Sequence, residues 1–505
     1  LDTTKYLDPD GDTTFDRDYG AAIYTAGRAV APQGDFKAPS NAVFGTQGGG
    51  IALEAGRDVV GAPMAQMVNQ WLFRQGRSGV DADGVARFEQ VRQPDGSTQT
   101  LQTAWWVRPD YFSGGVATFG GGDLSIRALT GSVRDLAASV ASSAYTTGLA
   151  LADSRLVEQG GGNLSVRAGQ DILGGQFFVQ KGRGQLRAAR DVAAGSVKAL
   201  DVLAPPKMDA DGNLVTDADG NPVDVYTPMK PVLALGDAQM AVTAGGSLQL
   251  EGVYNPTLTR QSRNNVAGNP DPDSPLLLFG NRSASALDAK SQFAQFSAFS
   301  TYGKNSAVAL TAVSGDLQLA NNATLLSYAG GPDVATASGD VSGQAGSFLY
   351  AYYPASLSAA ALTGNVTTAQ GMALAPSPVG QLELLAGQSL ALHSNGISFN
   401  TLTMLDNDPA SVSRATGPAL LTEADRKVMS GKTVGLAAHT PGQLHAADAV
   451  PARLVARKGD ITGQADQVAA IVLPKSAEIL AGRDIRDLGF SVQNLRAGDE
   501  TVVRA

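Results

Sequence analysis

Apolar and polar residues alternate along short stretches of this chain, and a small-residue turn followed by Asp, Ser or Asn ends each stretch. The stretch LSVRAGQDIL (164–173) places Leu164, Val166 and Ala168 on one side of an extended strand and polar residues on the other. The same pattern recurs as IALEAGRDVV (51–60), GQLRAARDVA (184–193), MAVTAGGSLQLEG (240–252), VALTAVSGDLQLA (308–320) and AEILAGRDIRDLG (477–489).

The spacing of these stretches indicates how they pack. Matching turn positions at Gly169 and Ala189 are 20 residues apart, and glycine triplets that end at Gly122 and Gly162 are 40 apart. A unit of about 20 residues with strands and turns but no helix predicts an all-β fold, a parallel β-helix (β-solenoid) whose coils stack. A β-sandwich of hairpin repeats is the alternative, although the repeated turn is not of the two-residue hairpin type.

The repeated turns have a structural explanation and a functional one. Glycine permits a positive φ at a corner, and the Asp that follows can accept hydrogen bonds from the turn backbone. A stacked row of these carboxylates binding Ca²⁺ is the alternative. The turn residues in question are Gly56, Asp58, Gly169, Asp171, Asp191, Gly482 and Asp484.

Insertions divide the repeat into five segments. We expect N-terminal coils over 1–60, an insertion over 61–119, and further coils over 120–202. Coils with hairpin and loop insertions follow over 203–300, and coils with a short helical insertion near 421–431 complete residues 301–505. In the first insertion, apolar residues from Met64 to Leu72 recur at helical spacing and predict an amphipathic helix, and residues 81–100 predict a polar hairpin.

Aromatic residues concentrate in this first insertion. We expect them to cap an open end of the β-helix or to pack the predicted helix against the rod. A glycan-binding platform and an interface with a partner protein are the alternatives. The residues are Trp71, Trp105, Trp106, Tyr111 and Phe112.

Composition narrows the chemistry. Cysteine is absent from the 505 residues, which excludes disulfides and thiolate metal sites, and no basic run predicts a nucleic-acid partner. The chain has three histidines and no adjacent Asp-Asp pair, so we expect no enzyme activity and no cofactor. A β-helical polysaccharide-active enzyme or glycan-binding module is the alternative function. Two DADGN sequences predict a hairpin of turns or, alternatively, a calcium loop built from Asp209, Asp211, Asp217 and Asp219.

The serial turns AGRDV, AGQDI and AGRDI at Gly56, Gly169 and Gly482, with the block TAWWVRPDYFSGGVATFGGGDLSIRA (103–128), resemble the filamentous haemagglutinin-type exoproteins of Gram-negative bacteria, and in particular a C-terminal portion of them. These are the cargo of two-partner secretion. The resemblance implies a right-handed parallel β-helix that is exported through an outer-membrane β-barrel partner. It also implies a secreted, cell-surface location and a role in adhesion, aggregation or biofilm.

We therefore expect a structural and adhesive segment that forms a stiff rod or an extracellular fibre. Its partners would be glycans or proteins of host or neighbouring cells, which it would contact at many weak points along the rod. Strand edges exposed at the end coils would allow self-association into fibres.

Overall fold

A computed structural model describes residues 22–38, 42–61, 68, 71–76, 78–80, 83, 85–92, 95–112, 114–196, 198–199, 227–257, 299–319, 351–368, 372–392, 402–409, 443–464 and 469–505. Within these ranges the structure consists of strands joined by loops and short turns, among them the 3-10 turns η3 (Pro109–Tyr111) and η4 (Leu151–Asp153), with no α-helix. Long parallel sheets dominate it, so the predicted all-β, solenoid-like architecture is confirmed.

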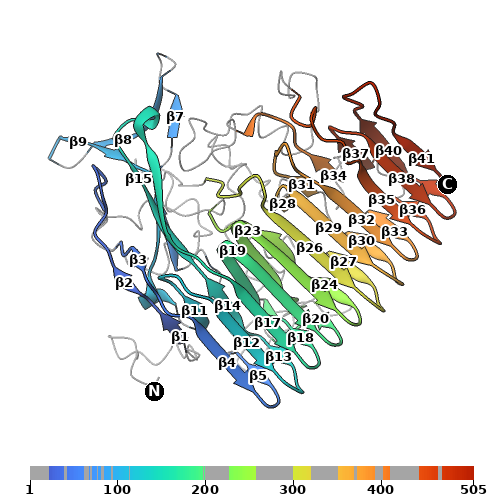
Figure 1. Cartoon of the computed structure of the whole chain (residues 1–505), viewed down its shortest axis with the longest axis horizontal. Helices are drawn as coiled ribbons and strands as arrows, with labels where there is room; N and C mark the ends of the chain where they lie inside the picture. Colours follow the sequence, from blue (N-terminus) through green and yellow to red (C-terminus); the bar gives the residue numbers. More distant parts are fainter. Residues whose placement is uncertain are drawn as a thin grey trace, which may run out of the picture.

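The chain winds into coils that contribute strands to three faces of a rod, and equivalent strands of neighbouring coils pair in parallel (Figure 1). The first face contains β4 (Ile51–Ala55), β12 (Leu124–Ala128), β17 (Leu164–Ala168), the second halves of β19 (Gln176–Ala188) and β23 (Val232–Ala244), β26 (Ala307–Ala312), β29 (Ser356–Ala361), β32 (Leu382–Ala386), β35 (Ala452–Ala456), β38 (Ala477–Ala481) and β41 (Val502–Arg504).

The second face is a ten-stranded sheet of short strands. It contains β5 (Val59–Val60), β13 (Val133–Arg134), β18 (Ile172–Leu173), β20 (Val192–Ala193), β24 (Leu248–Leu250), β27 (Leu317–Leu319), β30 (Val366–Thr368), β33 (Leu390–Leu392), β36 (Ile461–Thr462) and β39 (Ile485–Arg486). The third face contains β1 (Ala22–Thr25), β11 (Gly115–Thr118), β14 (Ala137–Val140), the first halves of β19 and β23, and β25 (Gly252–Tyr254). A five-stranded sheet continues this face beside β25, with β28 (Ala351–Tyr353), β31 (Met372–Leu374), β34 (Leu402–Met404), β37 (Ala469–Leu473) and β40 (Leu488–Val492).

The register gives the length of a coil. Leu164 of β17 pairs with Gly184 of β19, which is the predicted 20-residue period. Other steps are longer because the chain leaves the rod: Leu124 pairs with Leu164, and Glu383 pairs with Arg453. Excursions therefore change the spacing along the sequence without changing the register of the stacked strands.

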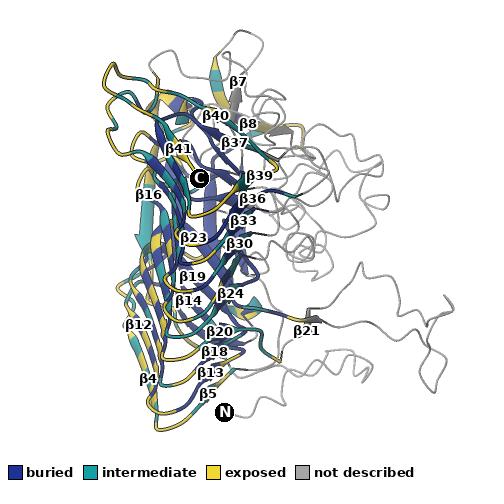
Figure 2. Ribbon diagram, turned by 90° about the vertical axis from the view of Figure 1, so that its right-hand side faces the viewer, coloured by how far each residue is buried: buried dark blue, intermediate teal, exposed yellow. Residues whose placement is uncertain are grey.

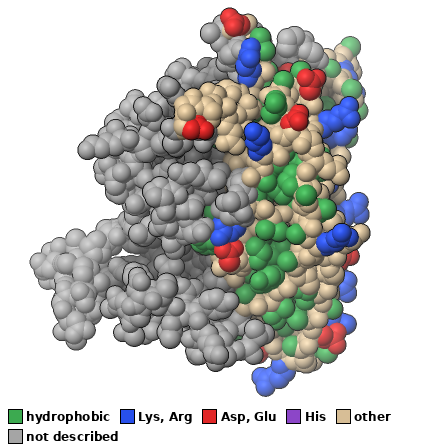
Figure 3. All heavy atoms as spheres, turned by 90° about the vertical axis from the view of Figure 1, so that its left-hand side faces the viewer, with side chains coloured by type: hydrophobic (Ala, Val, Ile, Leu, Met, Phe, Trp, Pro, Cys, Tyr) green, Lys and Arg blue, Asp and Glu red, His purple; other side chains and the backbone are tan. Residues whose placement is uncertain are grey.

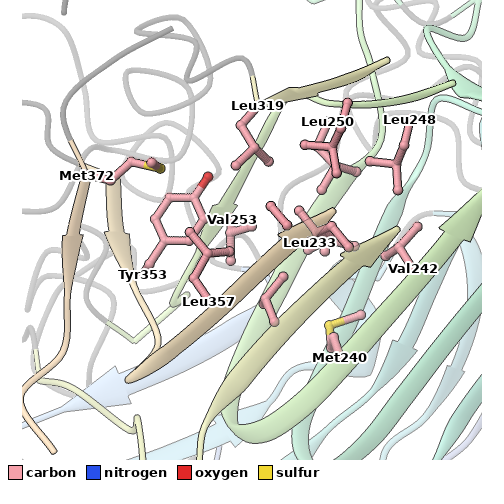
Figure 4. Close-up of a cluster of buried hydrophobic side chains, with 14 of the residues drawn as sticks. Leu233, Met240, Val242, Leu248, Leu250, Val253, Leu319, Tyr353, Leu357 and Met372 are labelled. Atoms are coloured by element: carbon pink, nitrogen blue, oxygen red, sulfur yellow. The ribbon is translucent and has the colours of Figure 1, made fainter. Parts of the chain in front are cut away.

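Alternating side chains of all three faces fill the interior of the rod. In β17 the residues Leu164, Val166 and Ala168 are buried, as predicted, while Arg167 is exposed. Figure 4 shows inward side chains from several faces meeting in one cluster, among them Leu233 of β23 and Leu248 of β24. Buried residues follow the strands, and exposed ones gather at the turns (Figure 2).

Alanine ends every first-face strand from β4 to β38, at the corner between the first and second faces. These alanines pair with one another from coil to coil. Because neighbouring strands lie about 4.8 Å apart, a larger inward side chain at this corner would collide with the rows above and below. The row consists of Ala55, Ala128, Ala168, Ala188, Ala244, Ala312, Ala361, Ala386, Ala456 and Ala481.

Glycine triplets lie just before the first face in three coils, at residues 48–50, 120–122 and 160–162. A Cβ on Gly162 would lie 2.6 Å from the carbonyl oxygen of Gly122 in the preceding coil, and its φ is +151°. Both the close approach of the backbones and the dihedral angle therefore require glycine at this position.

An antiparallel sheet covers the outside of the third face. This lateral sheet has the order β16 (Arg155–Gly160), β15 (Ser142–Thr147), β10 (Ala104–Val107) and β6 (Leu72–Gln75). Its strands come from two excursions of the chain, one before β11 and one between β14 and β17. The excursion at 142–160 lies within the segment 120–202, for which the sequence predicted only coils.

Smaller elements complete the described structure. The predicted polar hairpin over 81–100 is confirmed, since β8 (Ala86–Arg92) pairs antiparallel with β9 (Thr98–Leu101) and with β7 (Ser78–Val80). The remaining antiparallel pairs are β2 (Arg28–Ala29) with β3 (Gly45–Thr46), and β21 (Lys198–Ala199) with β22 (Thr227–Pro228). The predicted helix ending at Leu72 is wrong at its C-terminal end, because Leu72 begins strand β6. Residues 62–67 and the insertion near 421–431 lie outside the described residues.

Candidate functional site

A ladder of hydrogen bonds links the turn residues of successive coils at the corner between the first and second faces. Asp171 Oδ1 accepts a 3.0 Å bond from the backbone N–H of Asp191, and Asp191 Oδ1 accepts a 2.7 Å bond from the N–H of Ser247. The same contact recurs along the rod, where a side-chain oxygen of one turn accepts a hydrogen bond from the backbone N–H of the turn in the next coil. The acceptor and donor residues are Asp58 and Ser132, Ser132 and Asp171, Asp316 and Asn365, Asn365 and Ser389, Ser389 and Asp460, and Asp460 and Asp484.

Arginine side chains also donate hydrogen bonds to two of these carboxylates. Arg190 donates to both carboxylate oxygens of Asp171, and Arg483 and Arg486 lie 3.0 and 2.7 Å from Asp460 Oδ2. Burial raises the pKa of Asp171, but the hydrogen bonds from Arg190 and Asp191 outweigh it and lower the pKa overall. The backbone hydrogen bond from Asp484 is the main cause of the lowered pKa of Asp460.

Asp58, Asp171 and Asp191 thus have a structural role, because their oxygens accept the bonds that hold one coil to the next. Asp484 contributes its backbone N–H to the same ladder. Within the described ranges, no group of three or more carboxylate or imidazole side chains is placed to hold a metal ion. The DADGN residues Asp209, Asp211, Asp217 and Asp219 lie outside the described residues.

The structure gives a reason for the turn glycines that differs from the predicted positive φ. No positive φ occurs at Gly56, Gly169 or Gly482. A Cβ on Gly169 would lie 2.3 Å from the carbonyl oxygen of Leu129, and one on Gly482 would lie 2.5 Å from that of Arg457. Close stacking of neighbouring coils, rather than a left-handed backbone, therefore requires glycine at these two corners.

The aromatic residues of the first insertion pack the lateral sheet onto the rod. Trp71, Trp105 and Trp106 are each exposed by 1% or less, and Phe112 by 4%. Trp105 lies 5.8 Å from Phe299 between ring centroids. Because these four rings are buried, the glycan-platform hypothesis is wrong for them.

Their position also corrects the end-cap hypothesis. Trp71 packs against Phe178, which points outward from the third face, so the contact is with the side of the rod. Trp106 points to the opposite side of β10 and packs with Phe73 in a second small core. The lateral sheet therefore lies between the rod and the segment that follows β2, with buried aromatic side chains on both of its sides.

Tyr111 is the one predicted aromatic residue that keeps partial exposure. The guanidinium carbon of Arg108 lies 4.7 Å from its ring centroid and 5.3 Å from that of Phe73. This cation–π contact stabilises the rim of the sheet.

A buried polar cluster lies at the corner between the third and first faces, and no pattern in the sequence predicted it. Lys475, 2% exposed, donates to Asp448 Oδ2 and, over 2.9 Å, to Gln381 Oε1. His445 Nδ1 lies 3.4 Å from the same Asp448 oxygen. The sequence shows only a single lysine after a proline at this place. Its partner Asp448 lies 27 residues earlier in the chain, so no local pattern relates the two residues.

Burial dominates the electrostatics of this cluster. It lowers the pKa of His445, with a further lowering by the Lys475 charge, and it also lowers the pKa of Lys475. Burial raises the pKa of Asp448, but the hydrogen bond from Lys475 reverses this and the pKa is lowered overall. All three groups are buried, and Asp448 contacts both Lys475 and His445, so their arrangement joins residues 443–450 to the rod.

The end of the rod that carries β1, β4 and β5 is apolar. Figure 3 shows this end of the molecule, with hydrophobic side chains exposed along it. Ile23 and Tyr24 are each 44% exposed and Val60 is 65% exposed, while Ile51 and Leu53 only partly cover the core. This end therefore presents apolar side chains together with the edges of parallel strands.

Comparison with known proteins adds no relative. No protein-family model, curated sequence or solved structure matches this chain. Within the part of the chain that the structure describes, no helix has the length and apolar character needed to cross a membrane.

Proposed function

We propose that this chain is a structural and adhesive segment of a secreted bacterial surface protein, and that it acts as a stiff rod displaying side chains to other surfaces. The ladder of turn carboxylates supports this proposal most directly. The turn carboxylates, which the calcium-binding alternative would need as metal ligands, here accept the bonds that hold one coil to the next. The eleven strands of the first face would span about 50 Å along the axis.

Several features of the proposal go beyond the architecture. We propose a right-handed winding, because parallel strands joined by a crossover are right-handed in about 98% of cases. The exposed apolar strands at the β1 end favour self-association or stacking on further coils. Export through an outer-membrane β-barrel partner, as the sequence resemblance implies, fits a chain without cysteine, because no disulfide would need to open.

Attachment of the purified chain to cells tests this function. Beads coated with the chain are expected to attach to Gram-negative or epithelial cells above the level of albumin-coated beads, and soluble chain should compete. A parallel incubation with acidic and neutral polysaccharides measures the release of reducing ends. Absence of competed attachment would overturn the adhesive role, and catalytic release of reducing ends would establish the polysaccharide-active alternative.

A further inference from the structure

Three arginines stack in register on the solvent side of the first face. Arg127 of β12 pairs across the strands with Arg167 of β17, which pairs with Arg187 of β19. All three side chains are exposed, and the three strands are neighbours in Figure 1. Adjacent strands lie about 4.8 Å apart, so the guanidinium groups form a line along the axis of the rod. We call Arg127, Arg167 and Arg187 the arginine row.

The row is poorly neutralised. Glu54 of β4 stands next in register, and its Oε2 lies 3.4 Å from Arg127 Nη1, but both side chains are more than half exposed. Exposed pairs of this kind contribute little. Neither Arg167 nor Arg187 forms an ion pair with any residue that the structure describes.

Like charges directly opposite one another on neighbouring strands are destabilising. Another ionic row of the rod alternates in sign: Arg453 lies between Glu383 and Glu478 and pairs with both. The arginine row does the opposite, since it places three cations together. Packing of the rod does not account for this arrangement, whereas a bound anion would.

We propose that the arginine row binds a linear acidic polysaccharide, with the carboxylate groups of successive sugars on successive guanidinium groups. The planar guanidinium group suits carboxylates because it can donate two parallel hydrogen bonds. A straight row of cations on a flat sheet matches a linear polyanion that runs along the rod. Several weak contacts on one chain then add up through avidity.

The surroundings of the row favour a polysaccharide over a nucleic acid. A second outward row, two residues away on the same strands, consists of Ser125, Ser165 and Gln185. These neutral donors and acceptors suit sugar hydroxyl groups. Proteins that hold single-stranded nucleic acid also stack bases on aromatic side chains. On β12, β17 and the second half of β19, no outward residue is aromatic.

This inference names a ligand class for the proposed adhesive rod, and its biological meaning rests on that function. Binding is tested with the purified chain and size-fractionated polygalacturonate, followed by calorimetry at two salt concentrations. Neutral dextran and single-stranded oligodeoxythymidylate are the comparison ligands. We expect saturable binding of polygalacturonate that weakens with salt, and no binding of dextran.

The decisive variant combines Arg127→Gln, Arg167→Gln and Arg187→Gln. It should bind polygalacturonate at least about tenfold more weakly, and its binding should depend less on the salt concentration. Its melting temperature should not fall, because the change removes like-charge contacts. The matched control combines Arg155→Gln, Arg457→Gln and Arg504→Gln, which makes the same change in net charge at scattered exposed positions; it should bind like the wild type.

Each outcome decides the proposal. Equal losses in both triple variants would show that net charge, and not the row, carries binding. Unchanged binding in the decisive variant would exclude the row, and tighter binding of the oligonucleotide than of polygalacturonate would refute the ligand class. If the decisive variant loses polygalacturonate binding but its beads still attach to cells, the row binds as proposed and adhesion uses another surface. If wild-type beads fail to attach while polygalacturonate still binds through the row, the adhesive function fails alone.

Discussion

The turn ladder makes a local prediction at Asp171. Its Oδ1 accepts the backbone N–H of Asp191 from the next coil at 3.0 Å, the one acceptor recorded for that N–H among the described residues. Asp171→Ala removes this acceptor and leaves the amide without a partner. It also removes the contact with Arg190, whose side chain is 60% exposed.

The two losses differ in size. A partly buried donor left without an acceptor costs about 1–3 kcal/mol, whereas an ion pair with such an exposed arginine contributes only about 0.5 kcal/mol. We therefore expect Asp171→Ala to destabilise the local coil by about 2 kcal/mol. This corresponds to about 30-fold faster opening, since about 1.4 kcal/mol is a factor of ten.

Hydrogen exchange at the Asp191 amide measures this opening directly, which avoids assuming a two-state transition in a long repeat array. Asp171→Asn keeps an oxygen acceptor and should retain most of the protection. Equal loss in both variants would show that the charge of Asp171 holds the turn, and unchanged exchange in Asp171→Ala would refute the ladder.

The charge of Asp171 adds a pH signature. Its pKa is lower in the folded chain than in the unfolded one, so its contribution is fully present above the unfolded value of about 3.9. That contribution is lost as the pH falls through the folded pKa. The stability difference between the wild type and Asp171→Asn should therefore shrink below about pH 4, and a difference that stayed constant there would contradict the assigned pKa.

Three further predictions concern the corners and the buried cluster. Ala244→Leu overpacks the alanine row and should destabilise the neighbouring coils by about 1–3 kcal/mol, measured by hydrogen exchange of their amides, whereas Ala241→Leu, with its side chain on the outer side of the same strand, should change this exchange little. Gly162→Ala should lower the melting temperature because its Cβ meets backbone, whereas Gly49→Ala, with no heavy atom within 4 Å of its Cβ, should lower it far less. Burial lowers the pKa of His445 in the folded chain, so as the pH falls the unfolded chain takes up this proton at a higher pH than the folded chain, and stability should fall below about pH 6.5. His445→Gln should flatten this pH dependence of the melting temperature between pH 5 and 7. An unchanged dependence in the variant would show that His445 does not cause it.

The sequence predicted the parts of the fold that repeat. Alternation around Leu164 and Val166 indicated which side chains face inward, because a strand has a fixed period of two. The 20-residue step from Leu164 to Gly184 gave the coil length in a place without an excursion. Both patterns are local in the sequence, and they recur from coil to coil.

The parts that do not repeat were harder to predict. Trp105 and Trp106 have neighbours on opposite sides of β10, and only the assembled lateral sheet brings Phe299 and Phe73 to them. A run of aromatic residues in the sequence does not distinguish an end cap from an exposed platform or a buried layer. The Lys475 cluster has the same difficulty, because its contacts join segments that no local pattern relates.

Outward rows of the rod can vary in side-chain type while the backbone of the coils stays the same. Inward positions and the alanine corner are restricted by packing, since each stacks on copies of itself about 4.8 Å away. The outward row that begins with Glu54 is not restricted in this way, and its character changes along the axis from arginine to threonine and then to aliphatic side chains. In order it contains Glu54, Arg127, Arg167, Arg187, Thr243, Thr311, Ala360, Leu385, Val455, Leu480 and Arg504. Because one register holds all of these residues, moving the three arginines to positions 243, 311 and 360 should move polygalacturonate binding with them and leave the coils unchanged. The second outward row is uncharged there too, with Ala241, Ala309 and Ser358. Binding that did not follow the arginines would mean that the second outward row, and not the arginine row, selects the ligand.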